Sequence, residues 1–496
     1  MIEKFLIFFN HLYHKKYSNL DTSCHINRLK TPLFIHEFAL SYRGKLLTFE
    51  EINLNTTPLK LLIDLHYFKK IPSISMRDSK LTCNRCENNN PLEFAIINCK
   101  RCGESHSYCR SCIQMNRVLS CEELYFWQDQ SIGFNQICNA SSWKGKLTKN
   151  QKLASIKAIN ALENNSDLAI WAVTGSGKTE IVFPVIEKAL ARGLRICIAS
   201  PRADVIRELD LRLRTSFKKT TIESLYAQSP DKEGVSQLIL STTHQLIRYK
   251  KAFDLLIIDE VDAFPYALDE RLKRVTKRAR KDIGTTIFLT ATPDKLIRKQ
   301  IENKVLDGCF IPTRFHGFPL IIPRIVYCFR LSNQLKQAKL PESLTNILNN
   351  RDDKSRQLLI FVPTIELSLI LKKEIIKLLI ESHLITNQEQ VESVNAEDTN
   401  RKEKVRAFRN KELYCLITTT ILERGVTFPS IDVIVLNADH SLFNEAALVQ
   451  IAGRAGRSVK DPRGNVIFMV DYKTNAINQC IKDLKRMNKE IERNKI

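Results

Sequence analysis

The sequence lacks any long apolar run. No stretch of its 496 residues reaches the roughly 18 uninterrupted apolar residues of a membrane-spanning helix. The FLIFF run at residues 5–9 is too short for a signal peptide and has no cleavage pattern. Internal repeats and low-complexity tracts are also absent. We therefore expect neither a span nor export, but a folded chain of about three domains at roughly 150 residues each.

Positive charge is in excess. Lysine and arginine total 76 against 54 for aspartate and glutamate, which gives a formal net charge of +22. Such a surplus favours a polyanionic partner, either nucleic acid or an anionic membrane surface. Without an export signal, the expected location is cytoplasmic, with a peripheral position at the inner face of the cell membrane as the alternative.

From about residue 145, short apolar runs alternate with helical patterns, which is typical of a parallel sheet covered on both faces. The first set of runs is LAIWAV (168–173), LRICIA (194–199), QLILST (237–242), DLLIID (254–259) and TIFLTA (286–291). The second set is QLLIFV (357–362), YCLITT (414–419), DVIVLN (432–437) and NVIFMV (465–470). We therefore predict two α/β lobes, 145–310 and 320–496, with the proline-bearing segment 315–323 as their hinge.

The segment AVTGSGKT at residues 172–179 follows the first strand and opens a helix, which is the context that a P-loop needs. Gly175 and Gly177 let backbone N–H groups curl around phosphate oxygens, aided by the helix N-terminus. Lys178 is expected to reach the β- and γ-phosphates and Thr179 to supply a hydroxyl to Mg²⁺. The predicted ATP-binding loop comprises Thr174, Gly175, Ser176, Gly177, Lys178 and Thr179.

Two adjacent carboxylates, Asp259 and Glu260, end the apolar run DLLIID. Like charges repel at close range, so the pair is an odd structural choice for a strand end. It makes sense if Asp259 holds Mg²⁺ and Glu260 polarises the water that attacks the γ-phosphate.

The order of seven short motifs resembles superfamily 2 helicases and translocases. They are AVTGSGKT, ASPR (199–202), TTHQL (242–246), DEVD (259–262), LTATP (289–293), TTTILERGVTFP (418–429) and QIAGRAGR (450–457). The resemblance implies two tandem RecA-like lobes that close on ATP. It also implies that Arg457 is an arginine finger on the γ-phosphate, assisted by Arg454.

Further roles follow from the same resemblance. Gln151 lies upstream of the P-loop, where the family reads the adenine edge, and Thr290 and Thr292 couple hydrolysis to lobe movement. Gln450 and Gly453 complete the QIAGRAGR motif. The residues implied to touch the DNA strand or the nucleotide are Arg202, Thr243, Thr419 and Gly425.

Eight of the 14 cysteines lie between Cys83 and Cys138. Three Cys-x2-Cys pairs occur there, and two such knuckles make a tetrahedral thiolate site for Zn²⁺. The predicted metal ligands are Cys83, Cys86, Cys99, Cys102, Cys109 and Cys112. We favour Cys83 and Cys86 with Cys109 and Cys112, because YCRSC should open a helix while CNRC forms a turn. Cys99 and Cys102 remain the competing pair, and Cys121 with His106 leaves a second ion open.

With this zinc module (81–125) placed before the motor and an N-terminal appendage (1–80) before that, the chain resembles the ComFA family of late competence proteins. The motifs that carry the resemblance are YCRSCIQMNR (108–117), TTHQL, DEVDAFPY (259–266), RFHGFPLIIP (314–323) and TTTILERGVTFP. The resemblance implies a DNA-stimulated ATPase that helps to pull single-stranded DNA into the cell. Its implied partners are a membrane channel and a ComFC-type phosphoribosyltransferase-like protein.

Two charged segments lie outside these motifs, and one aromatic group ends DEVDAFPY. RLKRVTKRARK at residues 271–281 carries seven cations, and we weigh a solvated helix face equally against a patch that faces DNA or lipid. The aromatic residues from Phe264 to Tyr266 either stack a base or pack on their own lobe. The final segment from residue 483 alternates in charge and is predicted to be an exposed helix.

Two other functions compete with a single-stranded DNA translocase. One is a replication-restart helicase of the PriA type, but there the cysteine cluster interrupts the motor, whereas here it precedes it. The other is an ATP-switched DNA- or partner-binding protein without translocation. The presence of both Glu260 and Arg457 favours turnover over such a switch.

Overall fold

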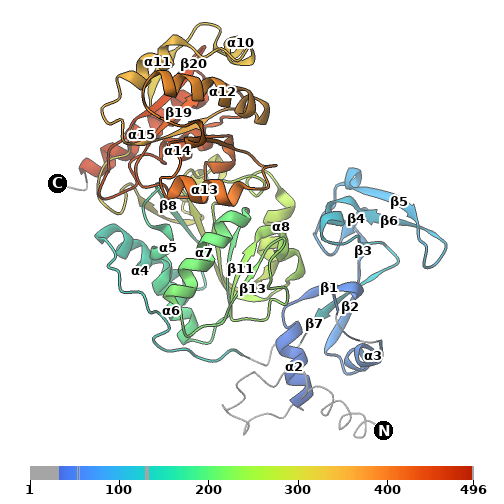
Figure 1. The fold of residues 1–496 in the computed structure, drawn as a ribbon. Coiled ribbons are helices and arrows are strands. Elements are labelled where there is room, and N and C mark those ends of the chain that lie inside the picture. The colour runs from blue at the N-terminus through green and yellow to red at the C-terminus, as the bar shows by residue number, and fades with distance from the viewer. Residues whose placement is uncertain (1–32, 53, 55, 129–132, 494–496) are drawn as a thin grey trace.

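The computed structural model describes residues 33–52, 54, 56–128 and 133–493. Cys24 and the FLIFF run therefore lie outside the described residues. Two lobes built on parallel sheets form the bulk of the molecule, and a smaller β-rich part precedes them (Figure 1). The predicted α/β class is confirmed. Among the described residues, no helix is both long and apolar enough to cross a membrane.

The first lobe is a seven-stranded parallel sheet in the order β10-β11-β9-β12-β13-β8-β14. Its strands are β8 (Leu168–Ala172), β9 (Ile196–Ser200), β10 (Ile222–Leu225), β11 (Leu238–Thr242), β12 (Phe253–Asp259), β13 (Arg280–Thr290) and β14 (Asp307–Ile311). Its helices are α4 (Lys149–Glu163), α5 (Lys178–Ile181), α6 (Phe183–Ala191), α7 (Ala203–Ser216), η5 (Thr243–Arg248), α8 (Glu270–Ala279) and α9 (Lys295–Glu302).

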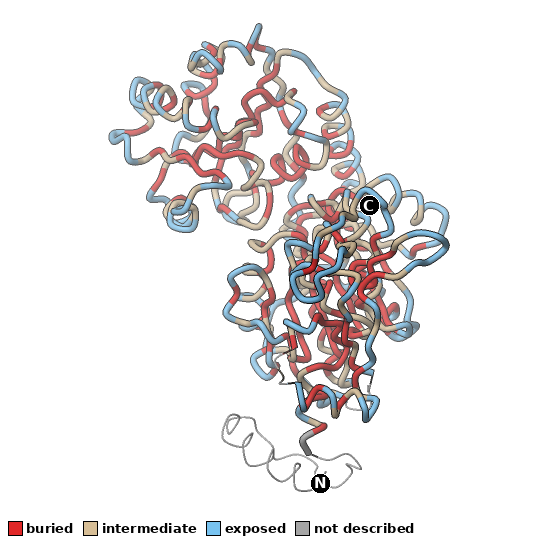
Figure 2. Tube along the Cα trace, turned by 90° about the vertical axis from the view of Figure 1, so that its right-hand side faces the viewer, coloured by how far each residue is buried: buried red, intermediate tan, exposed pale blue. Residues whose placement is uncertain are grey.

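Side chains of successive strand residues enter different cores of this lobe, as expected for a buried sheet. Ile196 and Ile198 pack with α4, α6 and α7 on one face. Cys197 and Ala199, between and after them, pack with α8 and η5 on the other face. Figure 2 shows that buried residues gather at the centre of each lobe.

The second lobe is a six-stranded parallel sheet in the order β15-β20-β19-β16-β18-β17. Its strands are β15 (Arg324–Tyr327), β16 (Gln357–Phe361), β17 (Val391–Val394), β18 (Cys415–Thr418), β19 (Ile431–Leu436) and β20 (Val466–Val470). Its helices are α10 (Leu331–Lys336), α11 (Glu342–Asn349), α12 (Ile365–Glu381), η6 (Gln388–Gln390), α13 (Arg401–Arg409), η7 (Thr420–Leu422), α14 (Glu445–Ala452) and α15 (Asn475–Arg493). Residues 312–323 join the two sheets without a strand of their own.

The N-terminal part combines a three-stranded antiparallel sheet, β1-β7-β2, with the hairpins β3–β4 and β5–β6. Its elements are α2 (Leu33–Tyr42), β1 (Leu46–Thr48), η2 (Phe49–Glu51), α3 (Thr56–Asp64), β2 (Phe68–Pro72), β3 (Ile74–Arg77), β4 (Lys80–Cys83), η3 (Pro91–Glu93), β5 (Phe94–Asn98), β6 (Ser105–Cys109), η4 (Arg110–Met115) and β7 (Glu123–Trp127). Lys250 of the first lobe donates a backbone hydrogen bond to Gly44 O at 2.9 Å. The N-terminal part is therefore docked on the first lobe.

Each of the nine predicted apolar runs overlaps a strand, so this prediction is confirmed. The sheets also contain β10, β14, β15 and β17, which the sequence did not predict. The prediction of an exposed C-terminal helix is partly wrong. In α15, Leu484, Met487 and Ile491 are buried, because their spacing of three and four residues places them on one face toward the lobe core.

Candidate functional site

The P-loop lies between β8 and α5. Gly175 and Gly177 have φ angles of +77° and +74°, a region that residues with a Cβ rarely adopt. A Cβ at Gly177 would lie 2.5 Å from Gln151 Nε2, so the close approach also requires glycine. The turn exposes backbone N–H groups at the start of α5, which is the arrangement that cradles phosphate.

Lys178 points back along the loop, where its Nζ donates to Ala172 O at 3.2 Å. Burial lowers the pKa of Lys178, while the carboxylate of Asp259 opposes that shift. A buried ammonium group gains from a nearby anion, since the anion replaces the lost solvation.

Asp259 and Glu260 lie at the carboxyl end of β12, beside the P-loop. Glu260 N donates to Asp259 Oδ1 at 2.9 Å, and Glu260 has a φ of +57°, which is uncommon outside glycine. Burial, and then the neighbouring Glu260, raise the pKa of Asp259 to about 7. A divalent cation would relieve both effects, because it would supply positive charge beside the two carboxylates.

Two arginines of the second lobe approach the same place from the end of α14. Arg454 Nε donates to Glu423 O at 3.1 Å, and Arg457 Nε donates to Gly453 O at 2.9 Å. Burial lowers the pKa of Arg454, and the charge of Arg457 lowers it further. A buried and a half-buried positive charge at one point favour a polyanion between the lobes.

The lobes are in contact at this point. A Cβ at Gly453 would lie 2.0 Å from Thr174 Oγ1 of the P-loop, so the QIAGRAGR motif rests directly on the loop. Arg202 of the first lobe donates to Ile421 O of the second at 3.2 Å. Asp204 forms an ion pair with Arg401 across the same boundary.

Arg424 was missed by the sequence analysis, although it lies inside the quoted motif TTTILERGVTFP. Its guanidinium contacts Asp262 at 2.6 Å and Glu260 at 3.8 Å, both in the first lobe. Asp262 in turn accepts hydrogen bonds from Thr290 Oγ1 at 2.8 Å and from Thr292 Oγ1. Burial alone would raise the pKa of Asp262, but Arg424 and these hydroxyl groups lower it more and hold it below the usual value. One side chain thus links three motifs across the lobes.

Arg314 is a second residue that sequence reasoning did not single out. Its Nη1 donates to Ala455 O at 2.8 Å in the second lobe, and the next residue, Phe315, donates its N–H to Gly175 O at 3.0 Å. Arg314 is 1% exposed. The segment that joins the sheets therefore ties the P-loop to the QIAGRAGR motif. No local signal distinguishes Arg314, because all the hydrogen-bond partners of its side chain are backbone carbonyl groups.

These groups surround one pocket of about 510 Å³ between the lobes. The predicted site residues that line it are Gln151, Thr174, Gly175, Ser176, Gly177, Lys178, Thr179, Asp259, Glu260, Gly425, Gln450, Arg454 and Arg457. Ser176 Oγ, Glu260 Oε2, Arg424 Nη1 and Arg454 Nη1 are buried without a hydrogen-bond partner in the described part of the chain. Unsatisfied hydrogen-bond donors beside the glycine-rich loop suit the phosphates of a nucleoside triphosphate, and the unsatisfied carboxylate suits its divalent cation.

Gln151 is held in place from two sides. Its Oε1 accepts from Thr148 N at 2.8 Å as part of the N-terminal cap of α4, and its Nε2 donates to Ser176 O at 2.7 Å. In this structure its amide therefore braces the P-loop.

Three of the residues implied to touch the DNA strand or the nucleotide lie outside the pocket lining. Arg202 is engaged in the contact between the lobes, Thr243 begins η5 and is fully buried, and Thr419 precedes η7.

Four cysteines of the N-terminal part converge on one point and are called the first cluster: Cys83, Cys86, Cys109 and Cys112. All are buried, and their sulfur atoms lie within 4.8 Å of one another. Cys83 and Cys112 are 3.7 Å apart and Cys86 and Cys109 3.6 Å. A zinc ion with Zn–S bonds near 2.3 Å needs tetrahedral edges of about 3.8 Å. The favoured pairing of knuckles therefore has the geometry of a metal site.

Cys99, Cys102 and Cys121 form a separate second cluster, also within 4.8 Å of one another. Cys102 is 3.1 Å from His106 Nε2. The competing pair thus does not share the first cluster.

Helix α8 docks on the first cluster, which corrects the interpretation of four of the seven cations in the basic segment 271–281. Arg271 donates to Ser111 O beside Cys112, and Arg278 donates to Arg85 O beside Cys86. Arg280 and Lys281 pair with Asp167 at 2.6 Å and Asp254 at 2.8 Å. These cations face the protein and not a solvent-borne polyanion.

The two aromatic residues before α8, Phe264 and Tyr266, differ in exposure. Phe264 is 75% exposed while Tyr266 is buried, so only Phe264 stays available for stacking.

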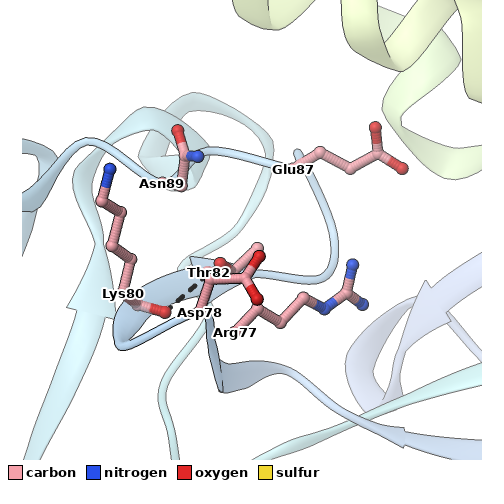
Figure 3. A pocket seen from close by; sticks show the side chains of 6 residues that line it. All are labelled: Arg77, Asp78, Lys80, Thr82, Glu87 and Asn89. Atoms are coloured by element: carbon pink, nitrogen blue, oxygen red, sulfur yellow. Dashed lines mark hydrogen bonds between the residues drawn. The ribbon is translucent and has the colours of Figure 1, made fainter.

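A further hollow of about 430 Å³ lies on the β3–β4 hairpin. Figure 3 shows the six side chains around it: Arg77, Asp78, Lys80, Thr82, Glu87 and Asn89. Cations and carboxylates are mixed along its wall, so it lacks the single sign of charge that selects a phosphate or a metal.

Three family models match successive parts of the chain. Residues 35–126 match the competence protein ComFA N-terminal domain, residues 153–299 the DEAD/DEAH box helicase, and residues 339–459 the helicase conserved C-terminal domain. The first match covers both cysteine clusters, and the other two cover the lobes.

Two similar proteins extend over nearly the whole chain, and a third covers part of it. Competence protein ComFA of Bacillus subtilis is 40% identical over 92% of this chain and 96% of its own length. Competence protein ComFA of Streptococcus pneumoniae is 36% identical over 91% of this chain and 98% of its own. Replication restart protein PriA of Haemophilus influenzae is 23% identical over 70% of this chain and 57% of its own.

Among solved structures, Saccharomyces cerevisiae Dbp5 bound to RNA and ADP BeF3 has a TM-score of 0.50 at 18% identity and covers 69% of this chain and 88% of its own. This likeness shows the fold, two RecA-like lobes.

Proposed function

The chain belongs to the ComFA family of competence proteins, and on that premise we propose that it is an ATP-driven motor that moves single-stranded DNA during uptake of transforming DNA. The observation that carries the proposal is the pocket between the lobes. There the P-loop, the paired carboxylates and the arginines of the second lobe converge.

Each group of residues in the pocket has a separate proposed role in ATP hydrolysis. The N–H groups of the P-loop and Lys178 hold the phosphates, and Asp259 with Thr179 would hold Mg²⁺, which offsets phosphate charge when bound. Glu260 has a carboxylate oxygen without a hydrogen-bond partner, so it is placed to orient a water molecule and accept its proton. Arg457 and Arg454 stabilise charge that develops on the γ-phosphate.

Contacts between the lobes connect this chemistry to movement. Arg424 joins Asp262 to the second lobe, and Asp262 binds Thr290 and Thr292. Phosphate charge in the pocket would favour the closed arrangement, since burial and the neighbouring charge of Arg457 both lower the pKa of Arg454. Loss of the γ-phosphate would weaken closure, and repeated opening would advance the strand.

The partners are proposals of the same kind. A ComFC-type phosphoribosyltransferase-like protein and a membrane DNA-uptake channel suit a motor of this family, and the first cluster is proposed to hold Zn²⁺ as part of the fold. The protein is expected at the cytoplasmic side of the membrane. The choice of DNA over RNA as the bound strand rests on the family, because contacts to backbone phosphates form with either nucleic acid.

The test compares ATP hydrolysis with and without single-stranded DNA for the parent protein, Glu260→Gln and the control Glu302→Gln, at the exposed end of α9. We expect DNA to stimulate the parent and the control, and Glu260→Gln to lose at least a hundredfold in kcat while still binding nucleotide. Hydrolysis that survives Glu260→Gln would disprove the assignment.

Movement needs its own assay. A translocase should displace streptavidin from one end of a biotinylated oligonucleotide only while ATP is hydrolysed. An ATP-switched binding protein would change its affinity for DNA but release no streptavidin, and that result would replace the proposed function.

A further inference from the structure

The backbone around Cys99 repeats the backbone around Cys83. In the first knuckle, Glu87 N donates to Cys83 O at 2.7 Å and Cys83 N donates to Asn88 O at 2.9 Å. In the other, Gly103 N donates to Cys99 O at 2.9 Å and Cys99 N donates to Glu104 O at 2.8 Å. The two bonds occupy the same sequence offsets in each case.

The residue four places after each first cysteine also matches. Glu87 has a φ of +58° and Gly103 a φ of +77°, a left-handed conformation that is costly for glutamate. A costly turn that occurs in both segments indicates a common geometric demand, namely that two thiolates point at one centre.

A third sulfur reaches this centre from another segment. Tyr108 of β6 forms a bridge with Leu119, and Ser120 N donates to Ser107 O at 2.8 Å, which brings Cys121 beside the knuckle. The sulfur atoms of Cys121 and Cys99 are 3.8 Å apart. That separation equals the edge of about 3.8 Å of a zinc–thiolate tetrahedron and is far longer than a disulfide bond of roughly 2.05 Å.

His106 brings a ring nitrogen beside one of these sulfur atoms, although the ring does not lie within 4.8 Å of all three. Its Nε2 lies 3.1 Å from Cys102 Sγ, while its Nδ1 lies 3.3 Å from Ser120 Oγ. A hydrogen bond from Nδ1–H to the serine hydroxyl would leave the Nε2 lone pair for a metal, as is common for zinc-bound histidine.

We propose that Cys99, Cys102, Cys121 and His106 bind a second zinc ion, separate from the site of the first cluster. Three thiolates and one imidazole make a closed tetrahedral set, which suits Zn²⁺. The ion ties the end of the β5–β6 hairpin to the segment that enters β7. Arg101, inside this knuckle, pairs with Glu50 at 2.7 Å, so the site also holds the hairpin against η2.

The experiment is zinc counting on the full chain by native mass spectrometry. We expect two ions in the parent, one in Cys121→Ser, one or a readily lost second ion in His106→Gln, and two in the control Cys138→Ser, an exposed cysteine outside both clusters. One ion in the parent, or two tightly held ions in Cys121→Ser, would overturn the proposal.

Unfolding is separated from ligand loss by a second measurement. Cobalt exchanged into the parent should give the absorption of both a four-thiolate and a three-thiolate site, and Cys121→Ser should lose only the second component. Loss of both components together would show that the variant unfolds the module, and Cys99→Ser then decides: retention of two ions there refutes the site. The number of zinc ions is measured without ATP, so its outcome tests the second site separately from the proposed ATP hydrolysis.

Discussion

The nucleotide pocket and the first cluster are both assembled from distant segments, but they are held together differently. The pocket closes across two lobes, and its arginines rest on carbonyl groups of their own lobe. The four cysteines of the first cluster lie within one module and are all buried. The pocket can therefore open without unfolding, whereas the cluster cannot. Substitutions in the pocket should change turnover, and substitutions in the cluster should change stability.

The largest effect is expected for Cys83→Ser. It leaves three thiolates at a buried metal site, so one zinc ion should be lost and the module should lose more than about 4 kcal/mol of stability. Zinc content by mass spectrometry and a separate calorimetric transition for the module measure this. The control Cys138→Ser should match the parent. Unchanged zinc content in Cys83→Ser would contradict the ligand assignment.

Arg424→Gln tests the other half of the comparison. It removes the cation that faces Asp262 and Glu260, so kcat should fall about a hundredfold, or about 2.7 kcal/mol, while the thermal transition of each lobe changes little. Steady-state hydrolysis and calorimetry give both values. Arg401→Gln, which breaks the ion pair with Asp204 outside the pocket, should cost less than threefold. Equal losses in both variants would show that any contact between the lobes suffices.

Arg278→Met probes the place where the two regions meet. Arg278 donates to carbonyl groups of Arg85, of Ile247 at 2.8 Å and of Tyr249 at 3.2 Å. Buried carbonyls left without donors cost about 1–3 kcal/mol. Hydrogen exchange should therefore rise in η5 and around Cys86, with zinc content and basal hydrolysis near the parent values. Lys277→Met, at the neighbouring exposed position, serves as the control. Slower ATP hydrolysis without faster hydrogen exchange in Arg278→Met would contradict the view that this contact affects stability and not turnover.

Local patterns and contacts between segments differ in how far the sequence foretells them. The P-loop and the Asp259–Glu260 pair could be predicted because each is a short motif on one strand end. Arg424, Arg314 and the docking of α8 could not, since their partners lie in other lobes or are backbone groups. The burial of Leu484 in α15 was predictable from its spacing, but the alternating charges around it obscured the pattern.

The smallest effect is expected for Gly453→Ala, and it sharpens the claim that the pocket closes by contact between lobes. A Cβ at position 453 would lie 2.0 Å from Thr174 Oγ1 and 2.7 Å from Thr174 Cβ, so rotating the threonine side chain cannot relieve the overlap. Gly453 has helical backbone angles, which alanine adopts freely. The folded second lobe should therefore be as stable as before, while closure becomes harder.

We expect kcat/KM for ATP to fall about tenfold, or about 1.4 kcal/mol, with no loss of thermal stability. Gly133→Ala is the matched control, because a Cβ there meets nothing within 4 Å. In the double variant, Thr174→Gly takes away the Oγ1 and Cβ atoms that overlap the Cβ added at position 453. This variant should therefore close the lobes more readily than Gly453→Ala alone, seen as tighter binding of a fluorescent nucleotide. If Gly453→Ala leaves nucleotide binding and hydrolysis unchanged, the lobes separate here during turnover, and contacts elsewhere, such as that of Arg424 with Asp262, carry the coupling between them.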